Sequence, residues 1–145
     1  MRQVFIVVLA LVMSGCTTMS KYGSFLPEDQ KVVEAKIADD AVKQLIKLYP
    51  PAKSRFNMKH AAKGVFGITL VRKLREAGYA VEEFAQRETA VTARDGLALG
   101  YILDVAGAPD FYRLTLMVGN QSISRPYIKQ GTEVLPAGNY SPLSA

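Results

Sequence analysis

The sequence of 145 residues has no tryptophan, one histidine and one cysteine. A single cysteine, Cys16, cannot form a disulfide within the chain and offers no second thiolate to a metal site. His60 is the only histidine, so a zinc or copper site would lack most of its usual ligands, and a Ser-His-Asp triad is not indicated. We therefore expect no metal and no cofactor, and we expect His60 at the surface or at the start of a helix.

The sequence also lacks a large net charge of either sign. Lys and Arg number 18 against 13 Asp and Glu, which gives a formal net charge of +5, and the basic residues are scattered. Such a modest excess is typical of a solvated surface, so no nucleic-acid partner is expected. The acidic pairs Asp39–Asp40 and Glu82–Glu83 are adjacent in sequence, and adjacent carboxylates diverge on a helix or strand. We expect neither an enzyme nor a small-molecule substrate.

The N-terminus has the three parts of a secretory signal. Arg2 supplies a positive charge, residues 4–13 are uncharged and apolar, and the small residues Ser14 and Gly15 precede Cys16. A permanent transmembrane helix would need about 20 apolar residues, and polar residues follow this shorter run at once. We therefore interpret residues 1–15 as a signal peptide.

The order Ser14, Gly15, Cys16 resembles the lipobox of bacterial lipoproteins. The resemblance implies signal cleavage between Gly15 and Cys16 and attachment of lipid, including fatty acyl chains such as palmitate, to Cys16. Two or three chains would hold the protein on a membrane stably, whereas one chain anchors only marginally. The residue after the cysteine is Thr17 rather than Asp, which by analogy with lipoprotein sorting favours the outer membrane. An incidental cysteine after an ordinary cleaved signal is the alternative.

The rest of the chain is predicted to be a tether followed by one domain. Residues 16–26 show no periodicity, so we predict a lipidated cysteine and a flexible tether there. Ten extended residues reach at most about 35 Å, which would keep the domain clear of the lipid headgroups. Residues 27–145 are expected to form a single periplasmic domain.

Two segments of this domain have the periodicity of amphipathic helices. Apolar residues recur every three or four positions from Pro27 to Tyr49 and again over 61–77. The expected inner residues are Val33, Ile37, Ala41, Leu45 and Leu48 in the first helix, and Phe66, Leu70, Leu74 and Ala77 in the second. Gly64 and Gly67 are expected to permit close packing of the second helix.

Other segments alternate between apolar and polar residues, as half-buried strands do. Alternation predicts strands over 52–59 and 97–105, a further pair at 111–118 and 122–128 joined by a Gly119–Asn120 turn, and short strands near 79–84 and 133–135. The expected inward residues of the two long central strands are Leu97, Leu99, Tyr101, Leu103, Val105, Tyr112, Leu114, Leu116 and Val118. Residues 85–96 are predicted to be a loop.

These patterns together predict an α+β fold, in which two amphipathic helices pack on one face of a mainly antiparallel sheet. The order is α-β-α-β followed by a β-meander. Pro126 suggests an edge strand, because proline cannot donate a ladder hydrogen bond. We therefore predict a partner-binding edge at Ile123, Pro126 and Ile128, to which another protein could add a strand.

The chain from Cys16 to about Gly138 resembles the TrbH family of conjugal transfer lipoproteins. The segments that carry the resemblance are "YGSFLP", "ADDAVKQLIKLYPPAKSRF", "FGITLVRKLREAGYAV", "LGYILD" and "YRLTLMVGNQSISRPY". The resemblance implies an outer-membrane lipoprotein of the mating-pair formation apparatus, a type IV secretion system, whose partners are periplasmic and outer-membrane proteins of the channel. None of these segments is a catalytic motif, and Cys16 is the functional residue that the resemblance carries over.

Two functions remain open at this point. The chain is either a structural or assembly subunit of the secretion channel, or a stand-alone envelope lipoprotein that binds peptidoglycan or regulates a cell-wall enzyme. Migration in a large complex would indicate the first function, and recovery with peptidoglycan would indicate the second.

Overall fold

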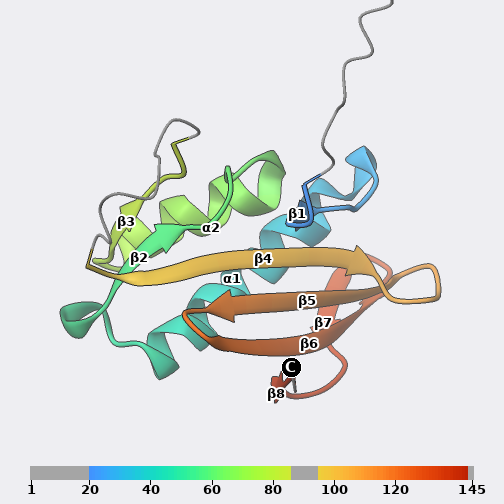
Figure 1. The fold of residues 1–145 in the computed structure, drawn as a ribbon. Helices are drawn as coiled ribbons and strands as arrows, with labels where there is room; N and C mark the ends of the chain where they lie inside the picture. Colours follow the sequence, from blue (N-terminus) through green and yellow to red (C-terminus); the bar gives the residue numbers. More distant parts are fainter. Residues whose placement is uncertain (1–19, 86–94, 144–145) are drawn as a thin grey trace, which may run out of the picture.

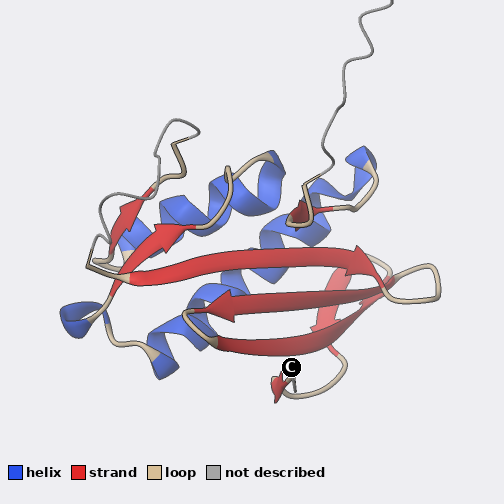
Figure 2. Cartoon of the chain, in the orientation of Figure 1, coloured by secondary structure: helices blue, strands red, loops and turns tan. Residues whose placement is uncertain are grey.

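The computed structural model of the protein describes residues 20–85 and 95–143. Two helices lie on one face of a mixed sheet, which confirms the predicted α+β class (Figures 1 and 2). The elements are β1 (Gly23–Ser24), η1 (Glu28–Gln30), α1 (Lys31–Leu48), η2 (Pro51–Lys53), β2 (Arg55–Met58), α2 (Gly64–Glu76), β3 (Ala80–Glu82), β4 (Leu97–Val105), β5 (Phe111–Val118), β6 (Gln121–Gln130), β7 (Glu133–Pro136) and β8 (Ser141–Pro142).

The sheet has the strand order β3-β2-β4-β5-β6-β7, and β1 and β8 pair additionally with β4 and β6. The first part is parallel: β3 pairs with β2, and both β2 and β1 pair with β4. From β4 onward the strands form the predicted antiparallel meander. The strand β4 therefore joins the two halves of the sheet, and it lies in front of α1 and α2 in Figure 1.

The core forms where the helices cover the sheet. The predicted inner stripes of both helices are buried at Ile37, Leu45, Leu70 and Leu74, and Phe66 packs against Tyr101 of β4 with 4.7 Å between ring centroids. The predicted inward faces of β4 and β5 are likewise buried at Leu99, Tyr101, Leu103, Tyr112, Leu114, Leu116 and Val118. Two expected core residues, Leu48 and Val105, are instead exposed. Each is the last residue of its element.

The domain begins earlier than the predicted tether allows. Gly23 and Ser24 pair with Ile102 and Leu103 of β4, and the Phe25 N–H donates to the Leu103 carbonyl at 2.8 Å. Residues 20–26 thus belong to the folded domain, and the prediction of a flexible tether over this range is wrong. The two-residue strand β1 has no periodicity of its own, so nothing in the local sequence distinguishes it from a loop.

The structure shortens one predicted strand and confirms one predicted hairpin. The predicted strand over 52–59 is confined to β2, because Pro51 begins a 3-10 turn instead. The predicted hairpin at Gly119–Asn120 is confirmed, since Val118 pairs directly with Gln121. Gly119 has φ +60°, and a glycine at the first central position suits a two-residue II′ turn.

Candidate binding surfaces

The structure places Pro126 in an interior strand, so the predicted edge is wrong. β6 pairs with β5 on one side and with β7 and β8 on the other. Ile123 lies between Leu116 and Pro142, and Ile128 lies between Phe111 and Leu135. Because β6 already has neighbours on both sides, a partner cannot add a strand to it at Ile123, Pro126 and Ile128.

Pro126 fits inside the sheet because it lies in a gap between two short strands. β7 pairs with residues 127–130 of β6, and β8 pairs with residues 123–124. The Pro126 carbonyl accepts the Ala137 N–H at 2.9 Å just beyond β7. In an antiparallel pair the N and C=O of one residue point to the same side, so the proline nitrogen also faces this gap. No ladder donor is therefore lost.

The outer edge of the meander is β7, and a proline protects it. The Ala137 N–H donates to β6, so the backbone N–H and C=O groups of the odd-numbered residues of this segment point toward β6. The backbone groups of the even-numbered Val134 and Pro136 point away from β6, toward the free edge. Pro136 has no N–H to offer at that edge. A short edge strand that ends in proline is a common protection against unwanted strand pairing.

The face of the sheet opposite the helices is not covered by any of the described elements (Figure 1). On this face Phe111, Ile128 and Leu135 form a row across β5, β6 and β7, because Phe111 pairs with Ile128 and Ile128 pairs with Leu135. Leu135 is 43% exposed, and the other two are half-buried. Of the three predicted partner residues, Pro126 and Ile128 lie on this face, whereas Ile123 packs against the core.

A second surface is a cleft of about 980 Å³ beside β1, where the N-terminal segment enters the domain. Its lining comes from the segment around β1, the start of α1, the loop between β2 and α2, and Phe84 after β3. The charged and aromatic side chains of the lining are Lys21, Tyr22, Glu28, Lys31, Glu34, Lys59, His60, Lys63, Phe84 and Tyr101.

Glu34 connects three elements at the base of this cleft. Its carboxylate accepts the Phe66 N–H at 2.7 Å and the Ser24 hydroxyl at 2.6 Å. Phe66 is in the first turn of α2, where backbone N–H groups lack partners within the helix. Lys63, the residue before α2, supplies no side-chain cap, so Glu34 from α1 caps α2 in its place. The contact fixes β1, α1 and α2 to one another.

His60 is buried in the wall of the same cleft, four residues before α2, which corrects the expectation of a position at the surface or at the start of a helix. Its Nε2 accepts the Tyr101 N–H at 3.2 Å, while Nδ1 lies 3.2 Å from the Ala61 carbonyl, so the fitting form is the neutral ring with the proton on Nδ1. Tyr22 stacks on the ring with 5.4 Å between centroids. Burial lowers the pKa of His60 below its ordinary value. The hydrogen bond to the Ala61 carbonyl raises the pKa, and the positive charge of Lys59 lowers it again.

A polar network joins α1 to the end of the chain. The Asp40 carboxylate accepts hydrogen bonds from Arg125 at 2.9 Å, from the Tyr127 hydroxyl at 2.6 Å and from the Tyr140 hydroxyl at 3.3 Å. Arg125 also donates to the Gly138 carbonyl at 2.8 Å. Burial raises the pKa of both tyrosines, so both hydroxyls stay protonated donors. The network holds the segment after β7 against α1.

Gly15 and Cys16, the predicted cleavage and lipidation residues, lie outside the described residues. Within 20–85 and 95–143, no group of three or more His, Cys, Asp or Glu residues is placed to hold a metal ion. In the same ranges no helix has the length and apolar character needed to cross a bilayer.

Comparison with known proteins gives one family. The family described as "Conjugal transfer protein TrbH" matches residues 19–144. No curated protein and no solved structure matches. The matched range contains every helix and strand described above, the uncovered sheet face and the cleft.

Proposed function

Because the chain belongs to the TrbH family of conjugal transfer proteins, we propose that it is an outer-membrane lipoprotein, anchored through Cys16, that serves as an assembly subunit of a conjugative type IV secretion apparatus. The observation that carries this proposal is the family match over residues 19–144, which spans the whole described domain. The lipobox-like order Ser14, Gly15, Cys16 supports the anchor. The domain acts by binding rather than by catalysis.

The protein partner binds on the uncovered face of the sheet. The row formed by Phe111, Ile128 and Leu135 supports this position, because neighbouring apolar side chains on an exposed surface commonly mark protein contacts. Contact through side chains replaces strand addition, since β6 is already paired on both sides. The lipid on Cys16 provides a second attachment and raises the local concentration of the domain near its partners.

The first experiment tests the anchor. Mass spectrometry of the membrane-extracted protein should show that residues 1–15 are absent and that Cys16 carries acyl chains. Cys16→Ser should release the protein from the outer-membrane fraction and reduce both its co-purification with channel components and the transfer of DNA between cells. A Cys16→Ser protein that remains as firmly membrane-bound as the unmodified sequence contradicts the anchor.

The second experiment tests the partner surface with a matched pair of substitutions. Leu135→Glu places a charge on the uncovered face, whereas Val32→Glu makes the same kind of change at a 64% exposed position on α1. We expect Leu135→Glu to weaken co-purification with channel components and Val32→Glu to leave it intact. Unfolding midpoints equal to that of the unsubstituted protein would show that neither variant's result comes from misfolding.

Two outcomes contradict the assembly role. If a chain truncated after Ser24 supports normal channel assembly and DNA transfer, the domain is not an assembly element. If the intact protein sediments with purified peptidoglycan and is absent from large complexes, it acts as a stand-alone envelope lipoprotein.

A further inference from the structure

The lysines of the domain divide into paired and unpaired groups. All five arginines in the described residues form ion pairs, as do Lys36, Lys73 and Lys129. Within residues 20–85 and 95–143, the lysines in no ion pair are Lys21, Lys31, Lys59 and Lys63 at the cleft, and Lys43, Lys47 and Lys53 elsewhere. All seven are exposed. Four unpaired cations thus line a single cleft.

Two carboxylates line the cleft and leave its charge positive. Glu34 is buried and already accepts the Phe66 N–H and the Ser24 hydroxyl, so it pairs with none of the four lysines. Glu28 is exposed on η1 and forms no ion pair within the described residues. With His60 neutral, four positive charges face two negative ones. Like charges gathered in this way repel one another unless an anion lies among them.

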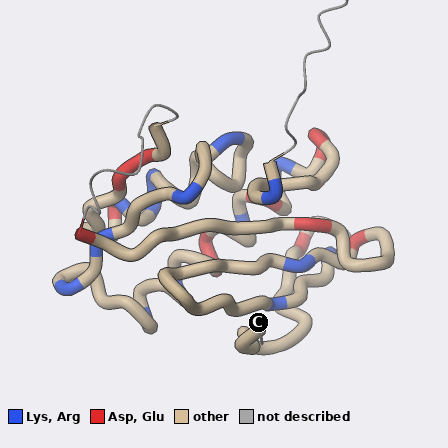
Figure 3. The backbone as a smooth tube through the Cα atoms, in the orientation of Figure 1, with Lys and Arg blue, Asp and Glu red and all other residues tan. Residues whose placement is uncertain are grey.

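The cleft lies at the end of the domain that is covalently nearest to the anchor residue. Ser20 and Lys21 are part of its lining, and Figure 3 shows basic positions next to the point where the N-terminal trace meets the domain. Three residues lie between Cys16 and Ser20, so the chain takes four steps from one Cα atom to the other and the two atoms can be at most about 14 Å apart. With β1 fixed to β4, the domain cannot move farther from a lipid on Cys16 than this short connection permits.

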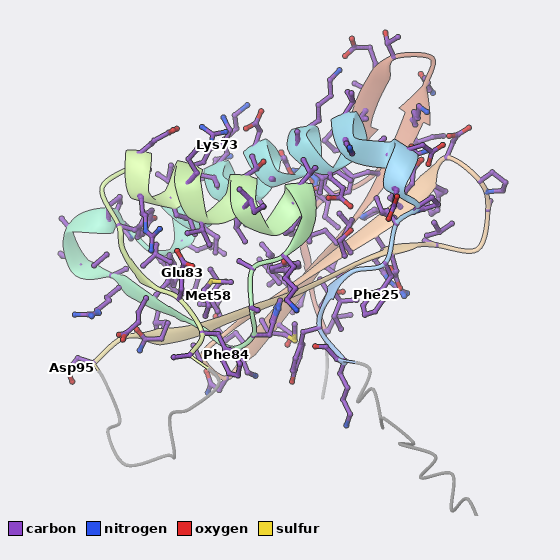
Figure 4. The ribbon with its side chains drawn as sticks, turned by 90° about the horizontal axis from the view of Figure 1, so that it is seen from above. Phe25, Met58, Lys73, Glu83, Phe84 and Asp95 are labelled. Carbon is purple, nitrogen blue, oxygen red and sulfur yellow. The ribbon has the colours of Figure 1, made fainter. Side chains whose placement is uncertain are left out.

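Exposed aromatic side chains accompany the lysines. Phe84 lines the cleft, Phe25 follows β1, and each is 47% exposed. Figure 4 places both on one side of α2, while the ion-paired Lys73 lies on the opposite side of that helix. Aromatic rings beside lysines are typical of surfaces that contact the membrane interface.

We propose that this cleft is a membrane-contact surface, at which Lys21, Lys31, Lys59 and Lys63 bind the anionic headgroups of phospholipids around the Cys16 anchor. The inference depends on the proposed lipidation. Each lysine near an anionic surface adds attraction that extends over about one Debye length, roughly 8 Å at physiological salt. The contact turns the domain so that its cleft faces the membrane and fixes the direction in which the uncovered sheet face is presented.

The test uses the lipidated full chain reconstituted into vesicles. One set of vesicles contains phosphatidylcholine alone, and the other contains about one quarter phosphatidylglycerol. The lysines are labelled with a membrane-impermeant amine reagent, and the labelling of each is measured by mass spectrometry together with the acyl mass on Cys16. Lys43, Lys47 and Lys53 serve as internal controls. Lys47 lies about 24 Å along α1 from Lys31, at 1.5 Å per residue.

We expect labelling of the four cleft lysines to fall several-fold in the anionic vesicles, with labelling of the three controls unchanged. Raising the salt to about 1 M, where the Debye length is about 3 Å, should remove the protection. If the protein is acylated and the labelling of all seven lysines is the same in the two kinds of vesicle, this inference is overturned and the proposed anchor is left intact. Absence of acyl chains on Cys16 overturns both.

Two further arms exclude other anions. If inorganic phosphate protects the cleft lysines equally well in phosphatidylcholine vesicles, the cleft binds a free anion and the membrane assignment is wrong. If protection requires another channel component rather than anionic lipid, the cleft is a protein-binding site and the assignment is again wrong.

A matched pair of variants tests whether the lysines act together. Lys31→Gln with Lys63→Gln should reduce the protection of Lys21 and Lys59 in anionic vesicles. Lys43→Gln with Lys47→Gln changes the net charge equally and should leave that protection unchanged. If the two double variants behave alike, the effect comes from overall charge and the cleft has no special role.

Discussion

The Nε2 atom of His60 accepts the backbone N–H of Tyr101 at 3.2 Å and replaces a strand carbonyl at that point of the sheet. β2 pairs with β4 as far as Leu99, and β1 begins to pair with it at Ile102. The imidazole occupies the interval between these two parallel strands. It supplies the acceptor that neither strand provides, so the N–H of Tyr101 is not buried without a partner.

This contact predicts that stability depends on pH near neutrality. Burial keeps the folded-state pKa of His60 below its ordinary value of 6.5, so the folded protein binds fewer protons than the unfolded chain. The stabilisation is complete above pH 6.5 and is lost as the pH falls through the folded-state pKa. Urea unfolding of residues 20–145, followed between about pH 8 and pH 5, should show the free energy of unfolding decreasing toward acid.

The control for this prediction is His60→Gln, which cannot titrate. It should be less stable at pH 8 by about 1–3 kcal/mol, because the Tyr101 N–H loses a well-placed acceptor. The difference between the two proteins should shrink as the pH falls. A constant difference across the range would mean that His60 does not cause the pH dependence.

Removal of the Glu34 cap should weaken the junction of β1, α1 and α2. Glu34→Ala leaves the Phe66 N–H and the Ser24 hydroxyl without their acceptor and should cost about 1–3 kcal/mol of unfolding free energy. Glu34→Gln keeps one acceptor oxygen and should cost less. Glu76→Gln, which removes an exposed ion pair with Arg72, is the comparison and should cost no more than about 0.5 kcal/mol.

Core packing predicts large losses at Leu70 and Leu116, both of which are fully buried. Each substitution by Ala should reduce the free energy of unfolding by about 2–5 kcal/mol. Ile68→Ala, two positions from Leu70 but 62% exposed, should change it by no more than about 0.5 kcal/mol. Chemical unfolding of residues 20–145 measures all three, and near-zero effects at both buried leucines would refute the assigned inward faces.

Gly67→Ala should destabilise the domain even though Ala favours a helix interior by about 1 kcal/mol. A Cβ at this position would clash with the Tyr101 hydroxyl and lie 2.8 Å from the Ala62 carbonyl carbon. Overpacking of this kind costs about 1–3 kcal/mol. Combining Gly67→Ala with Tyr101→Phe removes one of the two obstructions, so a double-mutant cycle should recover part of the loss. A stabilising Gly67→Ala would contradict the close approach of α2 to β4.

The parts of the fold that could be predicted from sequence are those with local repetition. Burial on one face repeats every three or four residues in α1 and α2 and every second residue in β4 and β5, so the sequence alone identifies Leu70 and Tyr112 as inward residues. The two-residue β1 has no such pattern, and its pairing with Ile102 depends on a distant strand. A proline in a strand indicates only that one backbone N–H is absent from the sheet. That N–H can be absent at an edge strand or, as for Pro126, in a gap between two neighbouring strands, so the sequence does not distinguish the two positions.

The cleft was not predicted, because its contacts join residues that are far apart in sequence. Glu34 and Phe66 are separated by 32 positions, and nothing around Glu34 distinguishes it from a solvated carboxylate. One indirect signal was present. The second helix follows Lys63 and lacks the Ser, Thr, Asp or Asn that usually caps a helix. An uncapped N-terminus requires an acceptor from elsewhere, and Glu34 provides it.

The pairing of Gly23 with Ile102 fixes an order of events during biogenesis. A chain is synthesised from its N-terminus, so β1 has no strand to pair with until β4 has followed it. We expect β1 to be the last strand of the parallel ladder to pair, because closing the long loop between Gly23 and Ile102 is slow compared with forming the hairpins of the meander. Under the proposed function, cleavage and lipidation at Cys16 would act on a chain whose β1 is still unpaired, and the pairing of Gly23 with Ile102 would follow.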